Sequence, residues 1–323
     1  MGRFRLRLLG GLNLDLKLET NMRRTKFLVA AAAFGLGAAI ATAAPAAAKP
    51  RAATDFAVGP QYNTTHVYVA AADFDKFVAS FVATFGGETS KQGQFQVTPT
   101  SSLTKSQLVL TPAGTISVFG FLTPVPYPFG AERTGYLVTD IDAAVKAARR
   151  NGAIRLIETF PDPIGRDVVV QWPGGVNMQL YWHTAKPNYA PLTSVPENRI
   201  YLTADAADEF IRRWTGFAHG RILSDEKSAP GSEAGQPDKT IRRVRITSGY
   251  GKLTLLVSNG QLPWPWGRDL TGYEVSDLQA TLAKAETAGA RVVARPYDAG
   301  DRRAALVEFP GGYIAEIHQA RAQ

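Results

Sequence analysis

The apolar positions between residues 134 and 183 change their spacing in a fixed order. Tyr136–Val138 is a short apolar run typical of a strand, and Asp140 after it is a favourable helix N-cap. Apolar residues then recur at helical spacing until Asn151 and Gly152 end the helix. Further strands are predicted at 154–157, 167–172 and 178–182. This stretch therefore predicts a β-α-β-β-β module.

The same order returns 137 residues further along the chain. Residues 126–179 and 263–316 share 17 identities over 54 ungapped positions. The identities include the glycines and prolines of a Pro-aromatic-Pro-aromatic-Gly segment and of a later Pro-Gly-Gly turn. Unrelated sequences would share only a few of these positions, so the chain contains an internal duplication.

A fainter version of the module precedes each of these copies. A strand-like run leads into a helical pattern in both places, and further strand-like runs follow. We therefore expect four modules in two domains, residues 60–183 and 197–320, joined by a proline-containing linker at 184–197. Residues 224–240 are polar and contain Gly and Pro, which predicts a mobile loop.

Residues 1–48 are typical of a leader with a signal peptide. Met22 is followed by the basic segment Arg23–Lys26, an uncharged apolar stretch over Phe27–Ala44, and small residues up to Ala48. These are the three parts of a secretory signal. We expect translation to start at Met22 and the mature protein to be periplasmic or secreted in a bacterium, with no stable membrane span after processing. A single transmembrane helix over the apolar stretch is the alternative.

The composition excludes several classes of function. Of the net charge of +8, residues 1–48 carry seven basic and two acidic residues, or +5; the other 275 carry 29 and 26, or +3. A nearly neutral body lacks the basic surface that nucleic acid requires. The chain has no cysteine, which excludes thiol catalysis, disulfides and cysteine-type zinc sites. The motifs of P-loop, dinucleotide-binding, zinc-protease and serine-hydrolase sites are also missing.

The tandem modules resemble the vicinal oxygen chelate superfamily, which includes glyoxalase I, extradiol dioxygenases and bleomycin- or fosfomycin-resistance proteins. The resemblance rests on Gly-Tyr-x-Val-x-Asp at 135–140 and 272–277 and on Pro-Gly-Gly-x-x-x-Gln-Leu-Tyr-Trp at 173–182. It covers nearly all of residues 60–183 and 197–320. It implies an α+β fold in which β-α-β-β-β modules form two cupped mixed sheets, and it says little about chemistry.

In this superfamily two modules surround a divalent metal, whose open coordination positions chelate neighbouring substrate oxygens. When the ligand positions are transferred to this sequence, His66 stands on a first strand and Gln179 and Glu316 stand on last strands. The resemblance thus implies one divalent ion, Zn, Ni, Fe or Mn, with these three residues as candidate ligands. Glu316 is also the candidate catalytic base. The amide of Gln179 can coordinate through oxygen but offers no negative charge.

The ligand set departs from the family pattern. The second His expected on the first strand of modules two and four is replaced, with Thr134 and Thr271 nearby, and the third-module counterpart of His66 is about Arg199. Pairing the first module with the fourth would bring His66 and Glu316 together. The module pairing and the presence of a metal therefore stay open at this point.

Two further groups are candidates for ligand binding. Arg166 and Arg303 are matched by the repeat and could hold a carboxylate or phosphate, or form ion pairs with Asp167 and Asp301 at turns. The aromatic residues of the two proline-rich segments could stack on a flat ligand or pack modules together. These residues are Tyr127, Phe129, Trp264 and Trp266.

We expect an exported protein that holds a small organic molecule in a β-cup. Its chemistry would be metal-dependent lyase, isomerase or dioxygenase action on vicinal oxygens. The alternative is a metal-free protein that binds or sequesters a small molecule without catalysis, and a third hypothesis is a structural module whose cups are filled by its own side chains. A homo-oligomer is compatible with each of these hypotheses.

Overall fold

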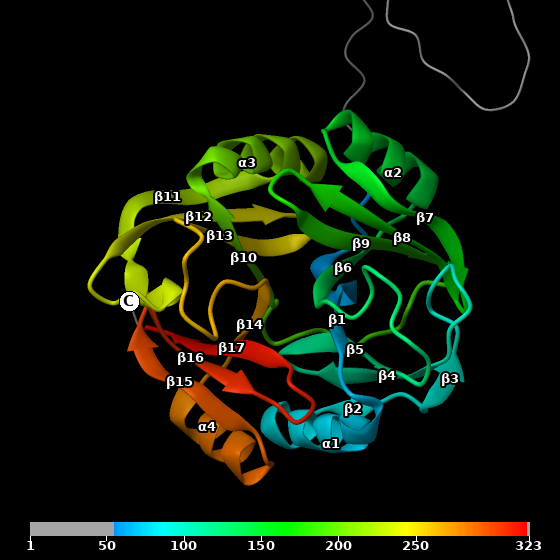
Figure 1. Cartoon of the computed structure of the whole chain (residues 1–323), viewed down its shortest axis with the longest axis horizontal. Coiled ribbons are helices and arrows are strands. Elements are labelled where there is room, and N and C mark those ends of the chain that lie inside the picture. The colour runs from blue at the N-terminus through cyan, green and yellow to red at the C-terminus, as the bar shows by residue number, and fades with distance from the viewer. Residues whose placement is uncertain (1–54, 322–323) are drawn as a thin grey trace, which may run out of the picture. The chain divides into compact units, whose positions relative to one another are not determined.

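The computed structural model describes residues 55–321, and Figure 1 shows how their elements are arranged. The leader predicted at residues 1–48 lies outside this range. The first half contains η1 (Pro60–Tyr62), β1 (Thr64–Tyr68), η2 (Ala71–Asp73), α1 (Phe74–Phe85), β2 (Glu88–Thr89), β3 (Gly93–Phe95), β4 (Thr104–Thr111), β5 (Gly114–Phe121), β6 (Arg133–Leu137), α2 (Ile141–Arg150), β7 (Ile154–Asp162), β8 (Gly165–Trp172) and β9 (Val176–His183). The second half contains β10 (Glu197–Thr203), α3 (Ala204–Ala218), β11 (Arg221–Pro230), η3 (Gly231–Ala234), β12 (Thr240–Ser248), β13 (Gly251–Ser258), β14 (Leu270–Glu274), α4 (Leu278–Thr287), β15 (Arg291–Asp298), β16 (Arg302–Glu308) and β17 (Ile314–Ala320).

Each half forms one curled mixed sheet, and the strand order is repeated. In the first sheet, β1 lies parallel to β5 and antiparallel to β6, and β6 lies parallel to β9. In the second sheet, β10 lies in the same way between β13 and β14, and β14 lies parallel to β17. Module one therefore pairs with module two, and module three with module four. The predicted α+β fold with two cupped mixed sheets is confirmed.

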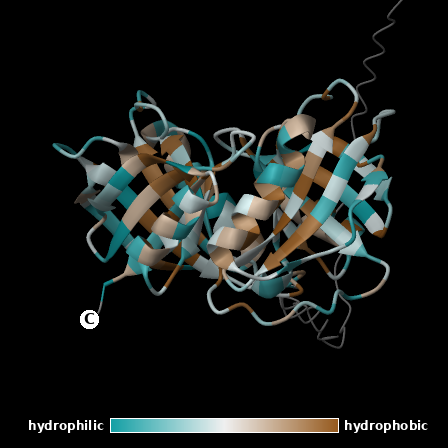
Figure 2. Ribbon diagram, turned by 90° about the horizontal axis from the view of Figure 1, so that it is seen from below, coloured by the Kyte–Doolittle hydropathy of each residue, from teal (hydrophilic) through white to brown (hydrophobic). Residues whose placement is uncertain are grey.

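Side chains alternate between two faces of each sheet because successive residues of a strand point in opposite directions. On β1, Val67 points into a core beside α1, whereas His66 points to the opposite, concave face. We call the concave face that carries His66 cup 1, and the face that carries Arg199 on β10 cup 2. Figure 2 shows the matching alternation of apolar and polar positions along the strands.

Two hydrophobic cores join the halves on the other faces of the sheets. In one core, Trp172 of β8 meets Trp214 of α3 edge to face, with ring centroids 5.4 Å apart. In the other, Phe81 of α1 packs on Phe309 and Tyr273 of the second half at 5.1 and 5.5 Å. In Figure 1, α2 and α3 lie together at the top and α1 and α4 at the bottom. Each core is therefore built from both halves, and the described residues belong to one compact unit.

The repeated Pro-Gly-Gly turns also hold the halves together. Gly174 and Gly311 have φ angles of 83° and 87°, a conformation that favours glycine. A Cβ atom on Gly311 would lie 2.8 Å from Cβ of Val69, and one on Gly174 would lie 2.5 Å from Cδ2 of Leu202. Each turn thus packs against the opposite half, which gives a physical reason for its repetition.

The helix boundaries follow the predicted capping. The side chain of Asp140 accepts a hydrogen bond from the backbone N–H of Ala143 at 3.0 Å, and its repeat partner Asp277 accepts one from Ala280 at 2.9 Å. No helix within residues 55–321 has the length and apolar character needed to cross a membrane.

The mobile loop predicted at 224–240 is wrong for the first part of that segment. β11 continues to Pro230, and η3 follows it directly. Ala229 and Ala234 of this segment pack with Ile241 and Leu256 in a small buried cluster. The prediction failed because it took the polar residues of this segment to be exposed, whereas one of them, Glu233, is buried in cup 2.

Candidate functional site

Cup 1 contains a cavity of about 280 Å³. Its walls come from both modules of the first half: β1, β4 and β5 on one side and β8 and β9 on the other. Aromatic side chains supply much of the lining, including Tyr68, Phe119 and Tyr181. Lys91, which lies between the short strands β2 and β3, and Phe95 of β3 close the outer edge. A mostly apolar hollow with a few polar groups is typical of small-molecule sites.

His66 lies in the wall of this cavity beside Gly135 of β6. A Cβ atom at position 135 would lie 2.3 Å from Cε1 of His66, so the glycine leaves the space that the ring occupies. The ring stacks on Phe119 with centroids 5.6 Å apart. Its Nδ1 atom is buried and has no hydrogen-bond partner among the described residues. Burial, assisted by the nearby charge of Arg133, lowers the pKa of His66 to about 3, so the ring is uncharged at neutral pH.

Gln179 of β9 connects a buried cation to a buried acid. Arg133 donates to its Oε1 atom from Nε at 3.0 Å and from Nη2 at 2.8 Å. The Nε2 atom of Gln179 donates to Oδ2 of Asp167 at 2.8 Å. Burial and the neighbouring carboxyl of Asp162 raise the pKa of Asp167 well above its usual value. The charged groups behind the cavity are therefore already bonded to one another or neutralised.

The predicted metal ligands do not form one site. His66 and Gln179 face cup 1, whereas Glu316 lies on β17 and faces cup 2. In cup 1, the strand neighbour of His66 across β6 is Arg133, a cation at the place where the second ligand is expected, and Arg133 occupies the amide oxygen of Gln179. The described residues contain no group of three or more His, Asp or Glu side chains arranged to hold a metal. The side chains present in cup 1 do not fit a divalent ion.

In cup 2 an arginine takes the position of His66. The strand registers align Glu197 with Thr64 and Arg199 with His66, as the sequence suggested for Arg199. The guanidinium of Arg199 is fully buried and contacts three carboxylates: Glu197 at 2.7 Å, Glu233 at 2.7 Å and Glu316 at 3.0 Å. Glu316 is thus paired with a cation that the protein itself supplies.

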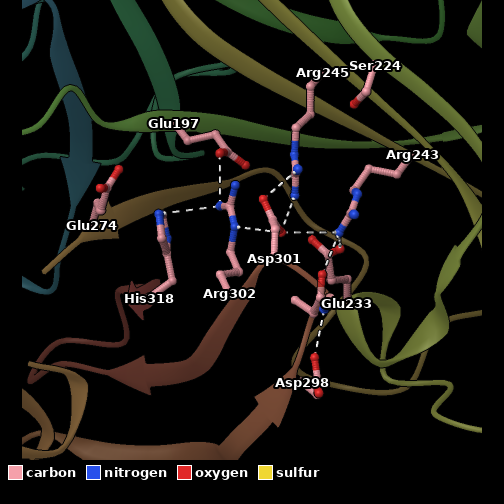
Figure 3. A network of polar contacts seen from close by, with 12 residues as sticks. Glu197, Ser224, Glu233, Arg243, Arg245, Glu274, Asp298, Asp301, Arg302 and His318 are labelled. Carbon is pink, nitrogen blue, oxygen red and sulfur yellow. Dashed lines mark hydrogen bonds and ion pairs between the residues drawn. The ribbon is translucent and has the colours of Figure 1, made fainter. Parts of the chain in front are cut away.

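Further charges complete this network, part of which Figure 3 shows. Arg302 donates to Glu197 at 2.9 Å and lies 3.3 Å from Nε2 of His318. Arg243 is bonded to the second oxygen of Glu233. Because Glu233 is carried by η3, the segment after β11 places a buried carboxylate inside cup 2. Cup 2 is filled by the protein's own side chains.

Two carboxylates of cup 2, those of Glu197 and Glu316, are held in their charged form. Burial opposes the ionisation of Glu197, but the charges of Arg302 and Arg199 outweigh it and hold the pKa of Glu197 well below its usual value. The pKa of Glu316 is lowered in the same way, chiefly by Arg199 against the effect of burial. A carboxylate with a depressed pKa that is fully engaged in ion pairs is a poor general base.

The two predicted arginines do not point into the cups. Arg166 forms an exposed ion pair with Asp142 of α2 at 3.0 Å, on the outer side of the sheet, rather than with Asp167. Arg303 is exposed, and its neighbour Arg302 points into cup 2. In β16 the residue that faces the cup is thus one position before the one that the repeat singles out.

The proline-rich segments divide into anchored and exposed residues. Phe129 is buried against Phe160. In the second half the repeat counterparts of these two residues, Trp266 and Tyr297, also pack on each other. The remaining two predicted residues, Tyr127 and Trp264, are exposed, and none of the four lines the cavity of cup 1. Phe129 and Trp266 are therefore packing residues beside the cups, whereas Tyr127 and Trp264 are not.

Sequence reasoning missed Arg133, Asp167 as a cavity residue, and Glu233. Strand alternation puts Arg133 on the same face as Gly135 and Thr134 on the other face, but which face lines the cup follows only from the pairing with β1. Thr271, the repeat counterpart of Thr134, bonds to Thr65 at 3.0 Å between the two halves. Glu233 carried no signal, since it stands outside the repeated segments.

Three solved structures share the architecture at low sequence identity. A triple mutant of 4-hydroxymandelate synthase from Streptomyces coelicolor has a TM-score of 0.56 and 13% identity over 83% of this chain and 94% of that chain. The 2,3-dioxygenase LapB from a Pseudomonas species has a TM-score of 0.50 and 12% identity over 84% of this chain and 94% of that chain. A fusion of a xylose isomerase-like TIM barrel with 4-hydroxyphenylpyruvate dioxygenase has a TM-score of 0.51 and 13% identity over 83% of this chain and 50% of that chain.

No family model and no curated protein matches the sequence. At these identities the structural likeness concerns the fold and not the chemistry. The duplicated modules, the repeated strand order and the three likenesses show that this chain has the fold of the vicinal oxygen chelate superfamily.

Proposed function

We propose that the protein binds one small organic molecule in cup 1 without a metal ion. The observation that carries this proposal is the contrast between the two cups. In cup 1, His66 is uncharged and lines an open cavity of about 280 Å³. In cup 2, the matching Arg199 is paired with three carboxylates. Cup 1 thus offers an open site for a ligand, whereas cup 2 is filled by side chains of the protein.

Metal-dependent action on vicinal oxygens is less well supported. Such chemistry needs several ligands with free lone pairs around one ion. In cup 1 the amide oxygen of Gln179 accepts from Arg133, and the guanidinium would repel a dication. In cup 2, Glu316 is bound to Arg199. Binding without catalysis therefore requires no rearrangement of the charges that are present.

A titration of the full chain with N-phenyl-1-naphthylamine, an uncharged apolar dye, tests the proposal. We expect a saturable rise in dye emission with one site per chain. Ser117→Trp places a large side chain in the cavity wall and should abolish the response. Ser101→Trp, at an exposed position of the same half outside the cavity lining, should preserve it. An unchanged response in Ser117→Trp, or the absence of a saturable response in the unmodified protein, would refute the proposal.

We also infer from the sequence that residues 1–48 direct export of the protein. The basic start, apolar middle and small-residue end support this inference. Expression in a Gram-negative bacterium followed by N-terminal sequencing of the periplasmic fraction tests it. The expected product begins near Lys49, whereas an uncleaved product in the membrane fraction would favour an anchor.

A further inference from the structure

Resting on the proposed function, we infer that cup 1 takes an uncharged molecule of about two rings whose single hydroxyl or carbonyl group bonds to His66. The inference combines the charge balance behind the cavity, the unpaired state of His66, the contents of cup 2 and the size of the hollow.

The charge balance of cup 1 disfavours a charged ligand of either sign. Arg133 is bonded to Gln179, to the Tyr68 hydroxyl at 2.7 Å and to the backbone of Ala131, and Gln179 in turn bonds to Asp167. A cationic ligand would meet the charge of Arg133 directly behind Gln179. An anionic ligand would lose its hydration and find no free cation in the deep part of the cavity. An uncharged ligand needs no counter-ion from this wall.

Two acidic residues, Asp162 and Asp167, line the cavity, and burial raises the pKa of both carboxyl groups. Asp162 is half-buried and Asp167 is 8% exposed. The one cationic side chain that joins them in the lining, among the described residues, is Lys91, and it is exposed at the rim where solvent screens its charge. The deep part of the cavity therefore presents no unpaired positive charge to an anion.

His66 supplies the polar group that remains unpaired. Its side chain is 5% exposed, and its Nδ1 atom lies against Gly135 of β6 and is closed to solvent, so the ring meets the cavity through its other nitrogen, Nε2. A neutral imidazole offers one donor and one acceptor, so a ligand hydroxyl or carbonyl satisfies it without any ionic contact. A buried polar atom that gains its hydrogen bond from a ligand contributes to both affinity and selectivity.

Cup 2 indicates where the ligand group lies. There, the side chain of Glu233 from η3 sits against Arg199, the counterpart of His66. In cup 2 the residue at this position, Arg199, is charged, and its partner, Glu233, is a charged group that the chain itself supplies. In cup 1 the residue is uncharged and the space in front of it is open, so its partner is uncharged and comes from outside.

The remaining walls and the volume define the rest of the ligand. Rings of Phe119 and Tyr68 stack side by side with centroids 5.3 Å apart, and both line the cavity together with Tyr181. Ring edges attract the face of a flat unsaturated molecule. A cavity of about 150 Å³ accommodates benzene, so roughly two fused rings suit a cavity of about 280 Å³.

Four probes with one ring system test the inference by calorimetry on the full chain: naphthalene, 2-naphthol, 2-naphthoate and 2-naphthylmethylammonium. We expect 2-naphthol to bind about tenfold more tightly than each of the other three. His66→Phe removes both ring nitrogens and keeps an aromatic side chain beside Phe119. It should lower the affinity for 2-naphthol to that for naphthalene and leave naphthalene binding nearly unchanged.

The outcomes separate the two proposals. Failure of all four probes to bind would refute the proposed function itself. Tightest binding of the carboxylate or the ammonium probe would overturn the inference while leaving a binding protein. Equal affinities for naphthol and naphthalene in the unmodified protein would remove the role of His66, and this comparison does not depend on whether His66→Phe folds.

Discussion

Arg133 donates two hydrogen bonds to the side-chain oxygen of Gln179, 3.0 and 2.8 Å long, between β6 and β9 of the first sheet. Because Arg133 is also the strand neighbour of His66, it stands where the superfamily resemblance implies a second metal ligand. The two residues that would have to coordinate an ion are thus bonded to each other.

The double variant Arg133→His, Gln179→Glu should gain affinity for a divalent metal. It would place two imidazoles and a carboxylate around the space now occupied by the guanidinium. A metal present at about 100 times its dissociation constant stabilises a protein by about 2.7 kcal/mol, so the melting temperature of the variant should rise on addition of Zn²⁺ or Ni²⁺. Scanning calorimetry with and without metal measures this rise.

The unmodified protein should show no such rise, and adding His66→Ala to the double variant should remove it. An equal metal-induced rise in the unmodified protein would show that Arg133 does not block the site.

Replacement of Arg199 should destabilise the fold strongly. Arg199→Met would leave three buried carboxylates without their central cation, and breaking a buried ion pair in this way costs about 3–5 kcal/mol. Urea unfolding of the full chain measures the loss. Arg242→Met is the matched control, because Arg242 also pairs with two carboxylates but lies closer to solvent, and we expect a loss of about 1 kcal/mol. Similar losses in the two variants would contradict the special role of cup 2.

Two adjacent glycines allow backbone strain to be separated from the contact between the halves. Gly311 and Gly312 have φ angles of 87° and 89°, so alanine is strained at both. Only at Gly311 would the new Cβ meet the other half, 2.8 Å from Cβ of Val69. Gly311→Ala should therefore lower the free energy of unfolding by about 1–3 kcal/mol more than Gly312→Ala. Equal losses would mean that the turn does not clamp the halves.

Glu132 should make the stability fall as the pH rises. Burial raises the pKa of Glu132 from 4.5 to about 8, although Thr271 donates a hydrogen bond to it at 3.0 Å. Between these two pH values the folded state holds a proton that the unfolded state has released. The stabilising contribution is thus complete below pH 4.5 and is lost as the pH rises through 8.

Glu132→Gln should flatten this part of the pH profile. Unfolding free energies of the unmodified protein and the variant, measured at several pH values between 5 and 8, provide the comparison. Asp269, the repeat counterpart with a pKa raised to about 7, also raises the pKa of Glu132, so the difference between the profiles reports the titration of this pair. Parallel profiles for the two proteins would contradict the prediction.

Much of the fold could be predicted because the same order of strand and helix signals occurs twice in the chain. The strand, helix cap and turn signals of residues 134–182 recur 137 residues later, and each match supports the other. The register between neighbouring strands could not be predicted from the sequence. Whether Arg133 or Thr134 faces the cup depends on pairing across β1 and β6, which no local pattern specifies.

The candidate site was predicted only in part for a similar reason. His66 and Gln179 reach the same cavity because their strands are brought together within one half. The separation of Glu316 from them depends on how the modules pair, and four similar modules leave that choice open. Glu233 lies in a segment with the composition of a loop. Its burial is explained only by its ion pairs with Arg199 and Arg243, which the sequence does not reveal.

Both hydrophobic cores lie on the faces of the sheets opposite the cups and are shared between the halves. Side chains inside cup 1 can therefore change with little effect on the packing that holds the chain together, while the ion pairs of cup 2 continue to contribute to cohesion. The duplication has thus left one cup whose lining residues can be replaced and one cup whose ion pairs contribute to the stability of the fold.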